Sequence, residues 1–404
     1  DAYNVAVGVL AGSAVTTGKE NTIVGGLAGD ALTVGGNNAV LGYFALGTDT
    51  KGSLSVAIGP SALESQNFTT ATNTYNTAVG AAAGAAVTTG AFNTLIGGIA
   101  ADALTTGQEN VALGYFALSS DTKGNHSVAI GKDALGSQNF TTSTDTFNTA
   151  VGFSAGVAVT TGTSNTLVGA LAGDAITTSV QNTAVGLSAL SAACNSSNTA
   201  VGGESLTACT GANNTAVGKD AGLQVTSGDN NIFIGFQSGI SGSPGGPQTT
   251  GSNKIGIGDE NITSFHAQVS LTVQSDERDK TDFVDLDLGL DFVKALEPVT
   301  YYWDKRSKYG DKNSDDFDLD NLTPDGTHKE DWMDVGFKAQ AVQALEDAAG
   351  YTASAKKNLT VSSSDDGKQL GLRYEKFIPI LVKAIQDQDA IIQSLTARIA
   401  ALES

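Results

Sequence analysis

The sequence predicts a mainly β fold: a parallel β-roll or β-solenoid of 16–17-residue coils, followed by a small α+β domain that ends in a coiled-coil helix. Three observations lead to this prediction. A Gly-, Ala- and Thr-rich pattern repeats through residues 1–258, the density of charged residues rises sharply after residue 258, and Ile and Leu recur at heptad spacing in residues 377–404. Together they indicate a repetitive β domain joined to a domain of ordinary globular composition.

The composition limits the kind of protein. The chain has 404 residues, a net charge of -20 and an isoelectric point near 4.3, which argues against nucleic acid as a partner. No apolar run approaches the ~20 residues of a membrane helix and no secretion signal opens the chain, so we expect no membrane insertion. The first residue is Asp1 rather than Met, and we therefore expect a fragment or a processed piece.

Charge divides the chain at one point. Residues 1–258 contain 6 Lys, no Arg and 14 acidic residues, which is 20 of the 64 charged side chains. Residues 259–404 contain the other 44, together with Trp303 and Trp332. Such a change in composition predicts a domain boundary near residue 258.

The pattern Asn-Thr-x-(Val/Ile/Leu)-Gly recurs at regular spacing through the N-terminal region. Its Asn lies at positions 4, 21, 38, 76, 93, 110, 148, 165, 182, 198, 214 and 231, and Ser55 and Ser127 take its place in two further units. Three steps of 17 residues and one of 21 make a super-repeat of 72 residues, so that residues 76–147 copy residues 4–75. Periodicity of this quality is typical of a solenoid.

Short stacked coils explain this pattern. Each repeat offers two strand-like pieces, such as residues 77–79 and 86–89, and strands this short are stable only when the coils above and below pair with them. Gly suits sharp turns and close backbone approach, and Asn at a fixed corner can form a ladder of amides between coils. The inward residues are mostly Ala and Val, so a thin roll buries little surface and we expect association with other chains.

Three segments of this region are closely similar to one another: Ser127-Val128-Ala129-Ile130-Gly131, Ser55-Val56-Ala57-Ile58-Gly59 and Thr77-Ala78-Val79-Gly80. They resemble the head repeats of trimeric autotransporter adhesins, and similar repeats occur in phage tail fibres. The resemblance covers roughly residues 1–240 and implies a trimeric, left-handed parallel β-roll.

The two 21-residue units contain insertions that we expect to bulge from one face as loops. The insertions carry four aromatic side chains, Phe68, Tyr75, Phe140 and Phe147. These aromatic residues are candidate receptor-binding residues that would stack on sugar rings at a host surface. The alternative is that they pack back against the roll as caps.

Cys194 and Cys209 are the only cysteines, and they occupy near-equivalent positions of adjacent coils. Coils ~4.8 Å apart lie within disulfide reach, but the two cysteines are one residue out of register with respect to Leu190 and Leu206. The sequence is compatible with a bridge and with two free thiols. Two thiols without a nearby His do not make a metal site, and we predict no metal and no cofactor.

The last 28 residues predict a coiled-coil helix. Ile378, Ile385, Ile392 and Ile399 occupy one heptad position, and Leu381, Gln388, Leu395 and Leu402 occupy the other. Ile at a with Leu at d favours a dimer by residue preference alone. The register shared along the whole upstream roll favours three strands, and we predict a trimeric coiled coil.

The hexapeptide Ser275-Asp276-Glu277-Arg278-Asp279-Lys280 lies at the seam between the two compositions. By itself such a segment is typical of a solvated, charged turn. A serine five residues before a lysine also fits a nucleophile with its base, because a serine hydroxyl attacks only when a neighbouring group takes its proton.

Five ordered blocks strengthen this second interpretation. They lie at residues 275–280, 288–292 (LGLDF), 296–303 (LEPVTYYW), 335–342 (VGFKAQAV) and 374–385 (YEKFIPILVKAI). Residues 275–404 thus resemble the auto-processing intramolecular chaperone domain at the C-terminus of phage tailspikes, endosialidases and tail fibres. The resemblance implies a trimerising chaperone that folds the upstream β-structure and is released by a Ser/Lys dyad, with Ser275 as nucleophile and Lys280 as base.

Such a dyad has an electrostatic requirement. A lysine acts as a base only when neutral, which requires its pKa to fall from ~10.4 towards about 7. The neighbouring acids Asp276, Glu277 and Asp279 favour the charged ammonium, so desolvation must overcome them. We therefore expect trimer assembly to bury Lys280 and so to switch cleavage on. The expected cut lies at Ser275, either between Gln274 and Ser275 or between Ser275 and Asp276.

The sequence therefore predicts four regions: the roll at residues 1–258, a neck at 259–274, the auto-processing chaperone domain at 275–376 and the coiled-coil helix at 377–404. We predict a homotrimeric fragment of a phage tail fibre or tailspike, made in the host cytoplasm and carried extracellularly in the virion tail. Its expected partners are its own copies, a host-surface glycan or protein receptor, and other tail proteins. The expected enzymatic activity is a single self-cleavage.

Two other functions stay open at this point. One is a polysaccharide depolymerase, with a glycan-cleaving site assembled across coils that the sequence does not reveal. The other is a bacterial surface adhesin.

Overall fold

The computed structural model of the chain describes residues 2–312, 314, 316–352, 357 and 359–403. It divides into two compact units. The first consists of Asp1–Ile240 and Gln248–Gly258, and the second of Ser241–Pro247 and Asp259–Ser404. The main division falls after residue 258, where the density of charge also changes.

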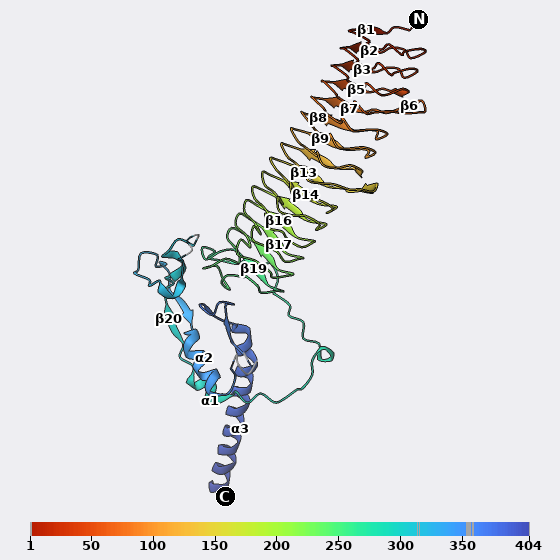
Figure 1. Cartoon of the computed structure of the whole chain (residues 1–404). Coiled ribbons are helices and arrows are strands. Elements are labelled where there is room, and N and C mark those ends of the chain that lie inside the picture. Colours follow the sequence, from red (N-terminus) through yellow and green to blue (C-terminus); the bar gives the residue numbers. More distant parts are fainter. Residues whose placement is uncertain (1, 313, 315, 353–356, 358, 404) are drawn as a thin grey trace. The chain divides into compact units, whose positions relative to one another are not determined.

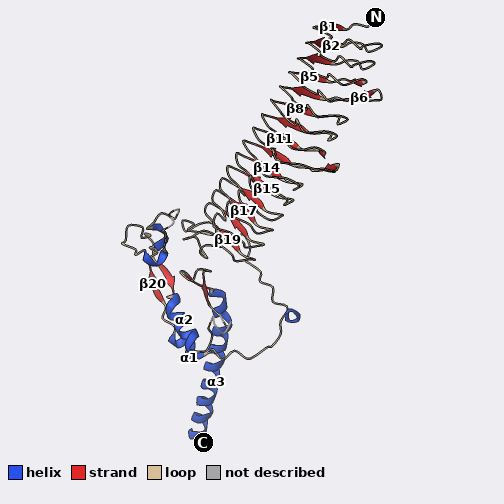
Figure 2. Ribbon diagram, viewed as in Figure 1, coloured by secondary structure: helices blue, strands red, loops and turns tan. Residues whose placement is uncertain are grey.

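The first unit is a parallel β-solenoid in which each coil adds one three-residue strand to a 15-stranded sheet (Figure 1, Figure 2). Neighbouring strands pair in register, so that Thr77 lies opposite Thr94 and Val79 opposite Ile96. The predicted parallel solenoid is confirmed. In sheet order the strands are β1 (Val5–Val7), β2 (Thr22–Val24), β3 (Ala39–Leu41), β5 (Val56–Ile58), β7 (Thr77–Val79), β8 (Thr94–Ile96), β9 (Val111–Leu113), β11 (Val128–Ile130), β13 (Thr149–Val151), β14 (Thr166–Val168), β15 (Thr183–Val185), β16 (Thr199–Val201), β17 (Thr215–Val217), β18 (Ile232–Ile234) and β19 (Ile255–Ile257).

The prediction of a second strand in each coil, for example at residues 86–89, is wrong. This segment lies in turns, because Ala82 and Gly84 have left-handed φ angles and bend the chain away from an extended path. Single hydrogen bonds still link it to the next coil, including the bond from the Thr88 N–H to the Thr105 carbonyl at 2.8 Å.

The 21-residue insertions form extra strand pairs. In the first super-repeat β4 (Gly52–Ser53) pairs in parallel with β6 (Thr72–Asn73), and in the second β10 (Gly124–Asn125) pairs in parallel with β12 (Thr144–Asp145). Some of the added residues therefore form strand pairs with the preceding coil, as the residues of the ordinary coils do.

The core of the solenoid is built from columns of inward side chains, and one coil contributes several of them, such as Ala78, Ala83 and Val87. The middle residue of each strand is buried in all but the terminal coils, as Leu95, Leu167 and Phe233 illustrate. A second column of aliphatic residues, such as Val87 and Leu104, fills the opposite side. Because many of these positions hold Ala, the interior is narrow, and backbone pairing must contribute much of the stability.

The predicted asparagine ladder is confirmed. The Asn76 Oδ1 accepts the backbone N–H of Asn93 at 2.9 Å, and the Asn93 Oδ1 accepts that of Asn110 at 3.0 Å. The Asn76 Nδ2 donates to the carbonyl of Gly90 at 2.8 Å, at the turn of its own coil. Asn76 and Asn93 thus each join one coil to the next and close their own corners, which satisfies groups that would be costly to bury unpaired.

A polar cluster replaces the ladder where Ser55 stands in place of Asn. The Gln66 Nε2 donates to the Asp49 Oδ2 at 2.6 Å and to the Ser55 Oγ at 2.9 Å, and the Gln66 Oε1 accepts from the Asn76 Nδ2 at 2.9 Å. The Asp49 Oδ1 also accepts backbone N–H groups, including that of Phe68. The next super-repeat contains the same cluster at Asp121, Ser127, Gln138 and Asn148.

The glycine that follows each strand has no room for a side chain. Gly202 has a φ of 137°, and a Cβ built there would lie 2.4 Å from the carbonyl oxygen of Gly218 in the next coil. The φ value disfavours every other residue, and the contact is with backbone that cannot move aside. Glycine is therefore required at this corner.

The two cysteines are buried and free. Burial, reinforced by the neighbouring Cys209, raises the pKa of the Cys194 thiol to about 12. Burial likewise raises the pKa of Cys209 to about 11, and its Sγ accepts a hydrogen bond from the Asn214 Nδ2 at 3.4 Å. Both residues replace aliphatic side chains of the second core column.

The second unit is a small α+β domain. Its secondary-structure elements, including four 3-10 helices, are η1 (Glu277–Asp279), α1 (Leu290–Ala295), β20 (Val299–Tyr301), η2 (Arg306–Lys308), η3 (Leu319–Asn321), β21 (Asp334–Gly336), α2 (Ala339–Ala348), β22 (Val361–Ser363), β23 (Leu370–Leu372), η4 (Tyr374–Lys376) and α3 (Phe377–Glu403). β20 pairs with β21 and β22 with β23, both antiparallel.

The apolar core of this unit gathers α1, α2, β22 and the start of α3. Its buried members are Leu288, Phe292, Val342, Val361, Phe377 and Ile380. The Asp387 Oδ2 on α3 accepts the backbone N–H of Leu290 at 3.1 Å, which caps the start of α1. α3 occupies the range predicted for the C-terminal helix, and its Ile and Leu heptad residues are exposed in the single chain.

Gly202→Ala is expected to lower the melting temperature of the solenoid, because the substitution combines a strained φ with a backbone clash and should cost at least about 2 kcal/mol. Gly203→Ala is the matched control, since its Cβ would meet only the Leu187 carbonyl oxygen at an ordinary 3.9 Å. Thermal denaturation followed by circular dichroism measures both. Equal melting temperatures for the two variants would contradict the assigned role of Gly202.

The cysteine thiols are expected to resist a thiol reagent at pH 8 in the folded protein. With a pKa of about 12, only about one Cys194 in 10,000 is a thiolate at that pH, and the side chain is buried as well. Reaction should accelerate as the pH rises towards the raised pKa values and become immediate in guanidinium chloride. Fast reaction of the folded protein at pH 8 would contradict this environment.

Candidate functional site

Ser275 and Lys280 lie at the two ends of a short charged loop. Residues 277–279 form η1, and the Asp276 side chain caps this helix by accepting the Arg278 N–H at 2.9 Å. The Lys280 N–H donates to the Glu277 carbonyl at 3.1 Å, which closes the turn. The loop thereby brings the Lys280 side chain back towards Ser275.

The two candidate catalytic side chains are in direct contact. The Lys280 Nζ lies 2.5 Å from the Ser275 Oγ and 3.3 Å from the Ser275 carbonyl oxygen. This distance permits proton transfer between a serine hydroxyl and an amine. Both residues are exposed in the single chain.

Arg278 binds the carboxylate of Asp276, the acidic residue that directly follows Ser275. Its Nε and Nη2 donate to the two Asp276 carboxylate oxygens at 3.0 and 2.6 Å. These side-chain bonds, with the backbone N–H of Arg278, hold the pKa of Asp276 below its usual value. The Asp276 carboxylate is therefore bound by a guanidinium within the same loop, while the Lys280 Nζ contacts Ser275.

The four aromatic residues of the insertions divide into two pairs. Phe68 and Phe140 are buried, so the single chain does not present their rings, and the cap alternative describes them better. Tyr75 and Phe147 are exposed. Of the four candidates, only these last two lie on the surface of the solenoid.

Sequence reasoning missed the neighbours of the exposed pair. Tyr75 stacks on Phe92 of the next coil with ring centroids 5.7 Å apart, and Phe147 stacks on His126 of the previous coil at 5.3 Å. All four residues directly precede the ladder Asn, or the Ser that replaces it, and have left-handed φ angles. That shared position in the repeat was the signal that could have predicted one surface column.

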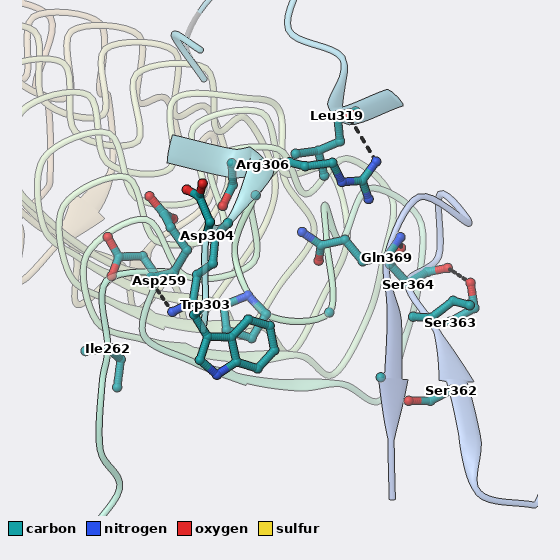
Figure 3. A pocket seen from close by; sticks show the side chains of 18 of the residues that line it. Asp259, Ile262, Trp303, Asp304, Arg306, Leu319, Ser362, Ser363, Ser364 and Gln369 are labelled. Carbon is teal, nitrogen blue, oxygen red and sulfur yellow. Dashed lines mark hydrogen bonds between the residues drawn. The ribbon is translucent and has the colours of Figure 1, made fainter. Parts of the chain in front are cut away.

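A surface pocket of about 510 Å³ lies in the second unit (Figure 3). Its lining includes Asp259, Trp303, Arg306, Ser364 and Gln369. The Arg306 Nη1 donates to the Leu319 carbonyl at 2.9 Å and its Nη2 to the Lys368 carbonyl at 2.6 Å, so this guanidinium already has partners. Neither Ser275 nor Lys280 lines the pocket.

Two further features bear on the class of site. Among the residues that the structure describes, no group of three or more His, Cys, Asp or Glu side chains is placed to hold a metal ion. Over the same residues, no helix is both long enough and apolar enough to span a membrane.

The fold and site define a β-solenoid protein with a separate C-terminal unit that carries a Ser/Lys contact at its start. Residues 275–351 match the family model described as chaperone of endosialidase. Comparison with curated proteins and with solved structures gives no match. The match begins at Ser275 and ends three residues after α2, and together with the solenoid it fits a tail fibre with a C-terminal chaperone domain.

Proposed function

We propose that the chain is a homotrimeric phage tail fibre or tailspike fragment whose C-terminal unit drives trimer assembly and then cuts the chain at Ser275. The match of residues 275–351 to the chaperone of endosialidase supports the chaperone role. The observation that carries the cleavage role is the 2.5 Å contact between the Lys280 Nζ and the Ser275 Oγ. The solenoid would serve as a shaft or as the part that binds a host receptor.

An apolar outer face of the solenoid supports self-association. The third residue of every strand in the 15-stranded sheet is Val, Ile or Leu, and it points away from the core. Several of these residues are exposed in the single chain: Val7, Leu41, Leu113, Val217, Ile234 and Ile257. At ~4.8 Å per coil the stripe is roughly 70 Å long. Monomeric proteins rarely leave so long an apolar surface in water.

The exposed face of α3 supports the same assembly. Ile385, Ile392 and Ile399 lie one heptad apart and are exposed in the single chain. Such a helix gains little from its own chain and is stabilised by packing against parallel copies of itself. In the proposed trimer, parallel chains in register would bring both apolar surfaces of each copy against their counterparts.

The cleavage chemistry needs a neutral lysine. In the proposed reaction the Lys280 amine takes the Ser275 hydroxyl proton while the Ser275 Oγ attacks a neighbouring carbonyl carbon, and the amine then returns the proton to the departing nitrogen. Attack on the Gln274 carbonyl gives an ester through a five-membered ring, and water then hydrolyses that ester. Attack on the Ser275 carbonyl itself requires a four-membered ring. The mass of the C-terminal fragment distinguishes the two cuts.

Assembly is the proposed switch. Ser275 and Lys280 are exposed in the single chain, where water stabilises the ammonium form. Burial of Lys280 between protomers would remove that stabilisation, so that cleavage follows correct assembly. Cleavage of pre-formed trimers should then be first order, and cleavage by isolated monomers would contradict the switch.

Ser275→Ala is expected to give one full-length band on a denaturing gel where the wild type gives two, because the nucleophile is lost. Ser270→Ala is the matched control, since this exposed serine lies five residues upstream, and it should cleave like the wild type. Lys280→Arg retains the positive charge but is not a base at neutral pH, and it should also give one band. Normal cleavage of Ser275→Ala would refute the proposed nucleophile.

Ile392→Asp is expected to convert the trimer into monomers when measured by light scattering in the Ser275→Ala background, because it places like charges in the centre of the helix bundle. The control is Ser394→Asp, two residues along the same helix and on the outer heptad face, which should stay trimeric. A monomeric Ser275→Ala parent, or a trimeric Ile392→Asp variant, would contradict this role of α3.

A further inference from the structure

Residues 268–274, immediately before Ser275, have the pattern of a strand without a strand partner. Val269, Leu271 and Val273 alternate with Gln268, Ser270, Thr272 and Gln274, which places the three apolar side chains on one face of an extended chain. In the single chain the segment forms neither helix nor strand (Figure 2). The exposed fractions of Val269, Leu271 and Val273 are 78%, 91% and 70%.

The segment has the composition of a strand in other respects too. Val269, Thr272 and Val273 are β-branched, and residues 259–288 contain no Gly or Pro. An unpaired strand of this kind exposes its N–H and C=O groups and readily pairs with another chain. In the single chain, residues 261–275 are all exposed.

The distribution of charge indicates which partner fits. Residues 261–275 contain no Asp, Glu, Lys or Arg, so identical copies of this stretch can approach one another without like charges meeting. The following residues, 276–287, contain six acidic and two basic side chains, a net charge of -4 per copy. Identical copies of that second stretch repel one another. The uncharged stretch therefore ends at Ser275, and the acidic stretch begins at the next residue.

We propose that residues 268–274 form a strand against the same segment of the neighbouring copies, and that this strand pairing ends at Ser275 because like charges would meet if it continued into the acidic stretch that follows. The partner is a further copy of this chain. The inference rests on the proposed homotrimer and self-cleavage, and it deepens them by assigning the element that holds the Gln274–Ser275–Asp276 backbone. The strand fixes this backbone from the N-terminal side, and the η1 loop fixes it from the other.

Hydrogen exchange measures the proposed strand directly. In the Ser275→Ala trimer, amides of residues 268–274 should exchange at least tenfold more slowly than in the Ser275→Ala, Ile392→Asp monomer. Exchange at the unprotected rate in the trimer would overturn the proposal. Equal protection in trimer and monomer would also overturn it, because the segment would then pack on its own chain.

A pair of variants links the strand to cleavage. Leu271→Asp puts a like charge on the apolar face and should slow cleavage at least tenfold, whereas Thr272→Asn, an uncharged polar change on the opposite face, should stay within about twofold of the wild type. If the wild type forms trimers and is cut, equal cleavage rates for the two variants would overturn this inference but not the proposed function. A wild type that neither forms trimers nor cuts would overturn the proposed function, and this inference with it.

Discussion

Each coil of the solenoid rests on the next through a backbone contact that leaves no space for a β-carbon. At the strand ends this contact repeats from coil to coil, with the carbonyl of one glycine lying where the side chain of another would be. The contact holds the coils at the spacing that three-residue strands need to pair and that asparagine side chains need to reach the next backbone N–H. The narrow core, the turns and the outward apolar stripe all follow from that spacing.

The polar cluster accompanies the 21-residue units. In these units Ser55 and Ser127 stand at the corner where other coils have Asn, and their backbone N–H groups still donate to the preceding ladder Asn. Asp49 and Gln66 then enter the second core column, where other coils have aliphatic residues, and replace the missing amide contacts. The burial of a carboxylate is tolerable because its oxygens accept several hydrogen bonds.

The repeat architecture was predictable because its causes are local and recur many times. The spacing of Asn and Gly gave the coils, the ladder and the parallel sheet. The turn at residues 86–89 was not predictable in the same way, since its Val and Thr residues favour a strand by local propensity, and the left-handed φ angles at Ala82 and Gly84 that precede them set a different path. The burial of Phe68 and Phe140 depended on where the inserted residues run, which no local pattern encodes.

For the candidate site, the sequence could supply the residue pair but not its surroundings. Ser275 and Lys280 were recognisable from their spacing and from the blocks that follow. The way in which Arg278 draws the Asp276 carboxylate to itself depends on loop geometry that the sequence does not specify. In the structure the Arg278 guanidinium binds the Asp276 carboxylate, whereas the sequence alone counts Asp276 among the free acids that favour a charged lysine.

The unequal coil lengths have a consequence for assembly. A bundle of identical solenoids with strictly uniform coils would have many nearly equivalent alignments, each displaced by one coil along the axis. In this chain a one-coil displacement would set an enlarged coil of one protomer beside an ordinary coil of another. A displacement by one whole super-repeat would also fail, because the 72-residue pattern stops after residue 147 and shorter coils follow. In the proposed bundle, the coils of unequal length would therefore leave only one alignment in which every coil meets its own counterpart.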